Sequence, residues 1–136
     1  MIMDQAEIYS DAQAVSATAY SARLIDNHSN GDDVVRAKTL FVHVGTGWTG
    51  GGTVAVELHD CDTESGSYTK VAELVPASAV TAVDGNGFLF VGPVPKGCRR
   101  YRKLRYVIAN TVTGLKVTAG ENLGAAEPLP SDILTR

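Results

Sequence analysis

The stretch "TVAVELHDC" (residues 53–61) alternates between two kinds of side chain and decides the fold class. Two valines and a leucine occupy every second position, and in an extended chain they all point to one side. A period of two with one apolar face predicts a β-strand in a sheet with one buried face. The stretch "KTLFVHV" (residues 38–44) alternates in the same way, and the glycine-rich "GTGWTGGG" (residues 45–52) separates the two. We therefore predict two strands that form a hairpin with a long loop.

Further stretches have the length and composition of strands. They cover residues 18–26, 67–75, 87–94, 99–110 and 114–120. The whole set amounts to seven or eight strands with turn signals at intervals of about 8 to 15 residues, a spacing typical of sandwiches and jelly rolls. We predict an all-β fold: an antiparallel two-sheet jelly-roll sandwich with extended N- and C-terminal arms.

The chain ends differ from this pattern. We place an N-terminal arm at residues 1–17, the jelly-roll domain at 18–120 and a C-terminal tail at 121–136. The tail contains proline and glycine and keeps no lasting period, which is typical of an extended or flexible end. A short helix is the alternative to an extended N-terminal arm, and its apolar face would consist of Ile8, Ala12 and Val15.

The composition indicates one soluble globular domain. The chain has 136 residues, of which 44% are hydrophobic and 20% charged. Its start lacks the basic and apolar segments of a secretion signal, and no apolar run approaches the roughly 20 residues of a membrane helix. We expect synthesis in the cytosol, no membrane partner, and reduced thiols at Cys61 and Cys98.

Charge is concentrated in one part of the sequence. Residues 85–120 contain seven cations and no Asp or Glu, so the net charge of −3 leaves −10 for the rest. On a strand, Arg99, Tyr101, Lys103 and Arg105 share the outward face, while Arg102 shares the other with core residues. Three interpretations follow: a solvated basic face, a docking surface for an acidic protein, or a nucleic-acid site. Nucleic acid is disfavoured because the net charge is negative and the cationic face has a single aromatic residue.

The sequence does not assemble a catalytic or metal site. His43 and His59 lie on what we predict to be neighbouring strands, but both alternate with core residues and so point outward, away from any enclosed site. No nucleophile motif accompanies them, and the glycine-rich loop lacks the lysine of a phosphate-binding loop. We expect no enzymatic activity, no cofactor and no metal. Trp48, in the glycine-rich loop, either folds back on its own domain or anchors an interface.

Four pieces of the sequence resemble the small jelly-roll capsid cement proteins, also called decoration proteins, of tailed double-stranded-DNA phages. They are "YSDAQAVSATAYSARLID" (residues 9–26), "LFVHV…GGTVAVELHDCD" (40–62), "PVPKGCRRYRKLRYVI" (93–108) and "LKVTAGE" (115–121). The pieces occur in the order found in that family, and the resemblance extends over roughly residues 9–120, which is most of the chain. They are patterns of strand and turn, without a catalytic signature.

The resemblance implies a non-enzymatic virion protein that binds the outer surface of the capsid, bridges capsomers and stabilises the shell against packed DNA. Its partners would be the major capsid protein and further copies of itself, as a homodimer or a trimer. The alternative is a carbohydrate-binding jelly-roll domain of a virion accessory protein, with Trp48 and Tyr101 as stacking residues. The interface residues that we predict are Arg99, Tyr101, Lys103, Arg105, Trp48, Ile8 and Tyr9.

Overall fold

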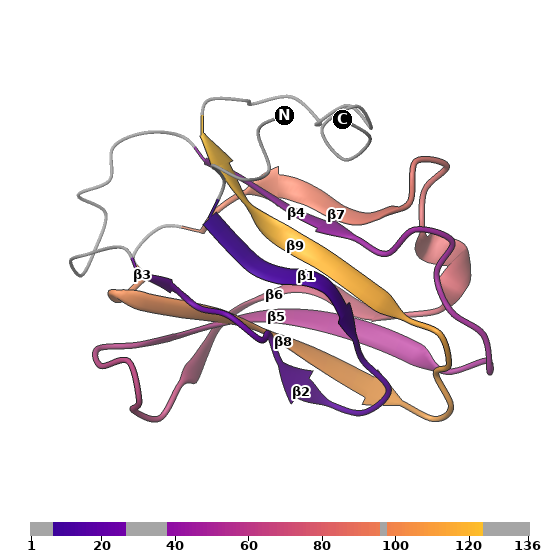
Figure 1. The fold of residues 1–136 in the computed structure, drawn as a ribbon, viewed down its shortest axis with the longest axis horizontal. Coiled ribbons are helices and arrows are strands. Elements are labelled where there is room, and N and C mark those ends of the chain that lie inside the picture. Colours follow the sequence, from indigo (N-terminus) through magenta and orange to yellow (C-terminus); the bar gives the residue numbers. More distant parts are fainter. Residues whose placement is uncertain (1–6, 27–37, 96–97, 124–136) are drawn as a thin grey trace.

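The computed structural model describes residues 7–26, 38–95 and 98–123, which form a two-layered β-sandwich (Figure 1). One sheet has the strand order β1-β9-β4-β7, and its strands are β1 (Glu7–Ala14), β9 (Lys116–Leu123), β4 (Lys38–His43) and β7 (Phe88–Pro93). The other has the order β2-β8-β5-β6, and its strands are β2 (Ala19–Tyr20), β8 (Tyr101–Ala109), β5 (Thr53–Cys61) and β6 (Thr69–Ser78). The short strand β3 (Ile25–Asp26) also pairs with β8, and a single 3-10 turn, η2 (Val80–Ala82), follows β6.

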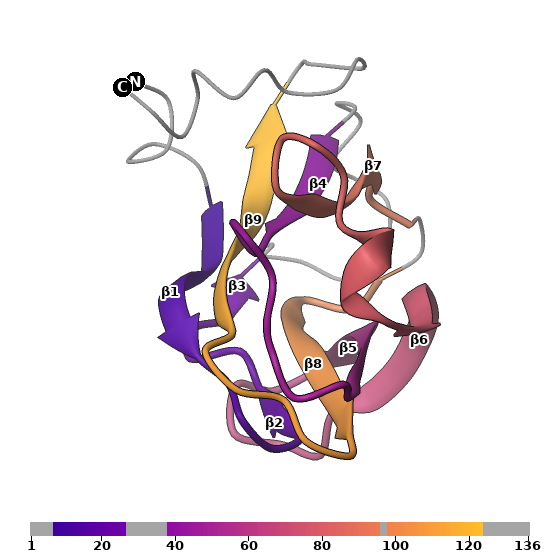
Figure 2. The same cartoon turned by 90° about the vertical axis from the view of Figure 1, so that its right-hand side faces the viewer.

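The strand order is that of a jelly roll. The chain passes repeatedly from one sheet to the other: β4 of the first sheet is followed by β5 and β6 of the second, then β7 returns to the first, β8 lies in the second and β9 in the first (Figure 2). Neighbouring strands are antiparallel throughout the described residues. The structure confirms the predicted all-β, antiparallel, two-sheet sandwich. No helix in the described part of the chain is long and apolar enough to cross a membrane.

The core lies between the two sheets. It is filled by the alternate residues that the sequence pattern placed on the inner face. These buried residues include Leu40 and Val42 of β4, Val54, Val56 and Leu58 of β5, Leu104 and Tyr106 of β8, and Val117 and Ala119 of β9. Each large aliphatic side chain removed from water in this way stabilises the fold by about 1.5–3 kcal/mol.

The predicted hairpin between residues 38–44 and 53–61 is wrong. β4 pairs with β7 and β9, whereas β5 pairs with β6 and β8, so the glycine-rich loop carries the chain from one sheet to the other. A close approach requires glycine in this loop: a Cβ added at Gly47 would lie 2.4 Å from Cγ2 of Val80. The alternation identified the inner face of β4 and of β5 correctly, and each of these faces packs against the opposite sheet. It did not identify the strands with which β4 and β5 pair.

The sandwich begins earlier than the predicted boundary at residue 18. Residues 7–14 form β1, which pairs with β9, and β9 itself continues to Leu123. The helical spacing in this segment has a simple cause: two register shifts and the positive φ of Ala12 (50°) interrupt the period of two. The parts of the predicted arms at residues 1–6 and 124–136 lie outside the described residues.

Candidate interaction surface

We call residues 98–105, which contain five cations, the basic segment, and Arg99 holds its start against β5. It precedes β8, and its guanidinium and backbone N–H both donate to Asp60, with a Nε–Oδ1 distance of 2.9 Å and a backbone N–Oδ2 distance of 2.8 Å. Asp60 is buried, and Arg99 also donates to the backbone oxygen of that residue. The hydrogen bond to Asp60 raises the pKa of Arg99. This arginine therefore has a structural partner inside its own domain.

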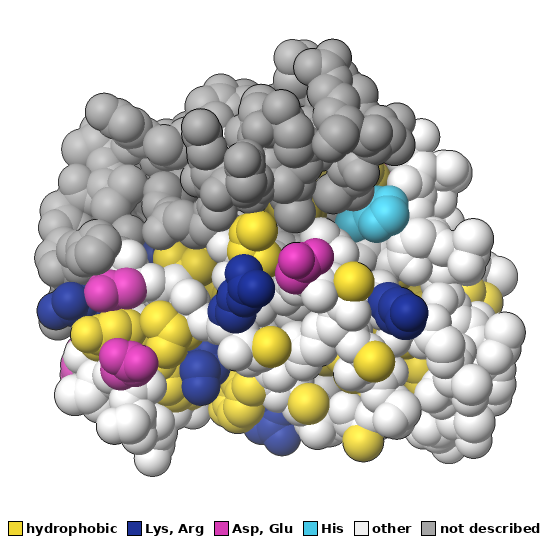
Figure 3. Space-filling view, in the orientation of Figure 1, with side chains coloured by type: hydrophobic (Ala, Val, Ile, Leu, Met, Phe, Trp, Pro, Cys, Tyr) yellow, Lys and Arg dark blue, Asp and Glu magenta, His cyan; other side chains and the backbone are white. Residues whose placement is uncertain are grey.

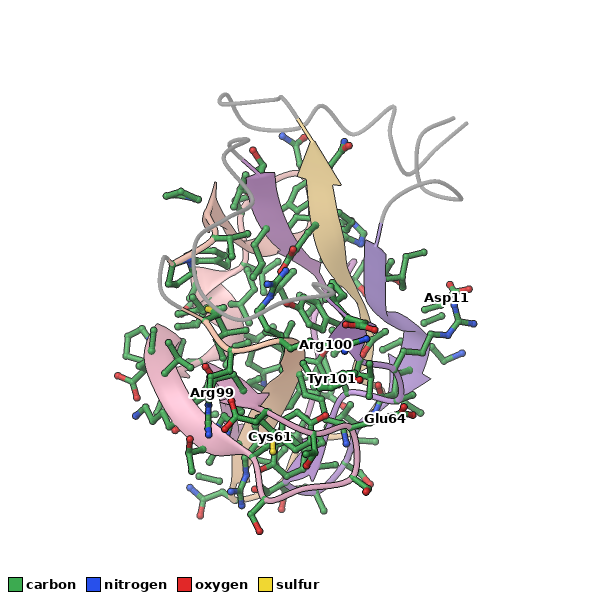
Figure 4. All side chains as sticks on the ribbon, turned by 90° about the vertical axis from the view of Figure 1, so that its left-hand side faces the viewer. Asp11, Cys61, Glu64, Arg99, Arg100 and Tyr101 are labelled. Atoms are coloured by element: carbon green, nitrogen blue, oxygen red, sulfur yellow. The ribbon has the colours of Figure 1, made fainter. Side chains whose placement is uncertain are left out.

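Arg100 has a partner as well. Its Nε and Nη2 donate to the two carboxylate oxygens of Asp26, at 2.7 and 3.0 Å, which is a bidentate pair. Its guanidinium also lies 4.9 Å from the ring centroid of Tyr101. Figure 4 shows Arg100 near Tyr101 at the end of the sandwich where β8 begins, and Arg99 farther to the side, toward β6. Tyr101 is half-buried.

Arg102 points into the core, as the alternation of β8 predicted. Its Nη2 donates to Oε1 of Glu121 at 2.6 Å, and the two side chains are only 4% and 0% exposed. Tyr9 of β1 donates its hydroxyl to the other oxygen of Glu121 at 2.5 Å. Burial and the charge of Glu121 raise the pKa of Tyr9 well above its usual range. Burial opposes the charged form of Arg102, but Tyr9 and Glu121 outweigh it and raise its pKa.

The prediction that Tyr9 belongs to an exposed interface is therefore wrong. Tyr9 is fully buried, and its hydroxyl donates a hydrogen bond to Glu121 in the core. Its neighbour Ile8 is half-buried on β1. The N-terminal strand thus contributes to the interior of the sandwich.

Two cations of the basic segment remain on the outer face of the second sheet. Lys103 Nζ lies 4.5 Å from the ring centroid of Tyr68 and 5.6 Å from that of Tyr20, and Arg105 Cζ lies 5.4 Å from the ring of Tyr20. We call these four residues the cation–tyrosine patch. Within residues 7–26, 38–95 and 98–123, neither cation forms an ion pair with a carboxylate. Both remain half-exposed.

The two tyrosines were missed by the sequence analysis. Tyr20 pairs directly with Arg105 through the two-residue strand β2, and Tyr68 comes from the loop before β6. Neither lies near the basic segment in the sequence. The sequence does place an aromatic residue, Tyr20, within the predicted strand 18–26. It does not show that Tyr20 pairs with Arg105 of β8, because that register depends on residues distant in sequence.

A polar network supports the patch. The hydroxyl of Tyr20 lies 3.3 Å from Nδ1 of His59, and Nε2 of His59 lies 2.9 Å from Oε1 of Glu57. The other oxygen of Glu57 lies 3.4 Å from Nζ of Lys70. The hydrogen bond with His59, together with Lys70, lowers the pKa of Glu57 against the opposing effect of burial. His59 is 4% exposed, so it is a packed residue of the outer face.

The two histidines are not neighbours. His43 belongs to β4 in the first sheet, whereas His59 belongs to β5 in the second sheet. Nε2 of His43 lies 3.1 Å from the backbone oxygen of Asn86. The prediction that they share adjacent strands is wrong for the same reason as the hairpin. Among the described residues, no group of three or more His, Cys, Asp or Glu side chains is arranged to hold a metal ion.

Trp48 does not form an exposed anchor. Its side chain belongs to the core cluster at 5% exposure, and its Nε1 donates to the backbone oxygen of Gly52 at 2.9 Å. Backbone hydrogen bonds in both directions between Thr49 and Thr113 hold the loop against the turn before β9. The predicted interface role of Trp48 is wrong, and the other alternative, a tryptophan folded back on its domain, is correct.

On the side of the molecule drawn in Figure 3, cations and carboxylates are interspersed, so this side has no large area of a single charge sign. The cation–tyrosine patch holds the two cations of the basic segment that remain after Arg99, Arg100 and Arg102 have paired with carboxylates.

Comparison with known proteins gives one result. The sequence model of a protein family described as Bbp16 matches residues 9–123, from the third residue of β1 to the end of β9. No curated protein matches the sequence. Since the match spans most of the chain, the protein belongs to the Bbp16 family.

Proposed function

We propose that this protein is a capsid cement protein, which binds the outer surface of a tailed-phage capsid, bridges capsomers and stabilises the shell against packed DNA. The observation that carries the proposal is the pair of outward cations, Lys103 and Arg105, on a sandwich whose other basic-segment arginines are used internally. Such a surface suits docking to a protein, because unpaired charges steer association and fix the register of an interface.

The architecture supports the same function. The described residues form a jelly roll with an apolar core and a buried ion pair that joins the sheets, so the surface is held on a rigid support. Rigid elements position interface residues more accurately than loops do. No reaction, cofactor or metal enters the proposal. In the virion, the protein would lie on the capsid exterior after synthesis in the host cytosol.

Self-association belongs to the proposal as well. A shell presents many identical sites, so a weakly bound subunit gains from each additional contact. A homodimer or trimer with two engaged footprints makes the second binding event intramolecular, at an effective concentration of about millimolar for short connections. The major capsid protein and further copies of the chain are therefore the proposed partners.

The structure argues against the carbohydrate-binding alternative, because Trp48, its main stacking residue, is buried. Sugar stacking requires an open aromatic face, but Trp48 is in the core. The rings of Tyr20 and Tyr68 are covered by Lys103 and Arg105. Tyr101 remains, half-buried and beside Arg100. Cations over the rings favour a charged partner over a neutral sugar.

The direct test is co-sedimentation with undecorated capsids of the phage that encodes the protein. At moderate salt we expect the purified protein to pellet with the capsids up to a fixed number of copies per shell, and to raise the temperature at which filled capsids release DNA. Fully decorated capsids serve as the matched control, since their sites are occupied. Failure to pellet with undecorated capsids, or binding without saturation, would refute the proposed function.

A further inference from the structure

We infer that the cation–tyrosine patch (Tyr20, Tyr68, Lys103 and Arg105) binds an extended acidic segment of its protein partner, with carboxylates at alternate positions. The inference rests on the proposed function, because it gives the chemistry of the partner that the capsid would present.

Glu57 is the carboxylate closest in register to Arg105. The two residues are directly opposite each other on β5 and β8. Glu57 nevertheless turns to His59 with Oε1 and to Lys70 with Oε2, at 2.9 and 3.4 Å. Both of its oxygens are thus engaged away from Arg105. The charge of Arg105 is left for an external carboxylate.

Lys103, like Arg105, has no carboxylate partner among the described residues. Its cross-strand neighbour on β5 is His59, which cannot supply a negative charge. Its ammonium group lies against Tyr68 and Tyr20 and has no carboxylate partner in the described part of the chain. Lys103 and Arg105, which have no carboxylate partner among the described residues, therefore lie side by side on the outer face.

The spacing of the cations selects the form of the partner. Residues two positions apart on one strand face are separated by about 6.6 Å, since each residue advances the strand by about 3.3 Å. An extended segment lying along β8 presents every second side chain to the sheet with the same repeat. Carboxylates at positions i and i+2 of such a segment match Lys103 and Arg105. Adjacent carboxylates do not, because they point to opposite sides.

The tyrosines hold the cations in place before binding. Both cations contact Tyr20, and Lys103 also contacts Tyr68. The Tyr20 ring is itself fixed by His59, whose ring meets it edge-on at a centroid distance of 5.3 Å. Long cationic side chains that are already ordered lose less rotamer entropy on binding. A cation already lies over each tyrosine ring, which reduces the ring surface on which a base could stack and favours carboxylates over nucleic acid.

The first experiment measures peptide binding by NMR titration of the isotope-labelled full-length protein. The probe is a peptide of alternating Ser and Asp. A second peptide has the same composition with its Asp residues in one block at one end, and a third has Asn in place of Asp. We expect the alternating peptide to shift the resonances of Lys103, Arg105 and Tyr20 and to bind several-fold more tightly than the block peptide. The Asn peptide should not bind.

Variants locate the site. The Lys103→Gln/Arg105→Gln variant should weaken binding of the alternating peptide about three- to tenfold, the range expected for two exposed ion pairs. The matched control is Arg23→Gln/Lys116→Gln, which also removes two exposed cations, one before β3 and one on β9, and should bind as the wild type does. The inference is overturned by equal binding of all three peptides or by unchanged binding in the Lys103→Gln/Arg105→Gln variant. It is also overturned by single-stranded DNA that shifts the same resonances as strongly as the acidic peptide.

A capsid-binding experiment with the same variants distinguishes failure of this inference from failure of the proposed function. If the wild type and the Lys103→Gln/Arg105→Gln variant bind undecorated capsids equally, the patch is not the docking site and the inference fails while the proposed function stands. If the alternating peptide binds at the patch but capsids do not bind the protein, the acidic ligand stands and the proposed function fails. Weakened capsid binding in this variant, with normal binding in the control, supports both.

Discussion

Arg102 of β8 and Glu121 of β9 form an ion pair across the core and thereby join the two sheets of the sandwich. The Nη2–Oε1 distance is 2.6 Å, and neither side chain is more than 4% exposed. Tyr9 of β1 completes the group by donating to Glu121. A buried pair of this kind constrains which strands meet, because each charge needs the other wherever water is excluded.

The ion pair predicts a strong asymmetry between single and double substitution. Glu121→Leu should destabilise the fold by about 3–5 kcal/mol, because it leaves the Arg102 charge buried and uncompensated. Arg102→Met/Glu121→Leu should recover most of that loss, because no charge then remains in the core. Urea unfolding followed by circular dichroism measures both variants. A double variant no more stable than Glu121→Leu alone would contradict the prediction.

Stability should fall on the alkaline side because of two buried tyrosines. Burial raises the pKa of both Tyr9 and Tyr106 above the usual value. In the unfolded chain these groups lose their protons near pH 10, while the folded state keeps them, so rising pH favours unfolding. Each tyrosine should cost about 1 kcal/mol one pH unit above that point. Unfolding free energies measured from pH 8 to 11 test this.

Tyr106→Phe is the variant for the alkaline experiment. It removes one titrating group and the hydrogen bond with Ser10, so it should be somewhat less stable at pH 8 but lose less stability between pH 9 and 11. A slope identical to that of the wild type would mean that Tyr106 does not carry the alkaline effect.

Glu57 should make stability depend on pH on the acid side. His59 and Lys70 lower its pKa in the folded state, so its stabilising contribution is complete above its unfolded pKa near 4.5 and is lost as the pH falls through the lower folded value. Glu57→Gln should cost about 0.5–1 kcal/mol at pH 6, and this difference from the wild type should shrink by pH 3.5. Glu73→Gln, at an exposed carboxylate near the same lysine, is the control. A pH-independent difference for Glu57→Gln would contradict the prediction.

The sequence predicted the strands because alternation is a local property. The inward residues of β5 and β8, such as Val56 and Leu104, follow from the period of two alone. The sheet to which a strand belongs depends on its partners, which are distant in sequence. For this reason β4 and β5, adjacent along the chain, were wrongly paired.

The candidate site shows the same division. Lys103 and Arg105 were placed correctly on the outward face, since both belong to β8. Arg99 was grouped with them, but it precedes the strand, where alternation no longer applies, and its position is set by Asp60. The carboxylates that neutralise the other arginines are 19 to 74 positions away in the sequence. A run of five cations therefore overstated the free positive charge.

Trp48 should report on the core and have no part in docking. It is the single tryptophan of the chain and is 5% exposed, so its fluorescence should be blue-shifted and resist quenching by acrylamide in the folded protein. Trp48→Ala should destabilise the fold by about 3–5 kcal/mol, because it leaves a cavity and frees the backbone oxygen of Gly52. Trp48→Phe keeps most of the volume and should cost less. Since both changes lie in the interior, Trp48→Phe should bind undecorated capsids as the wild type does, at a temperature where it is fully folded. Strong quenching of the wild type, or loss of capsid binding in folded Trp48→Phe, would place this residue at the surface after all.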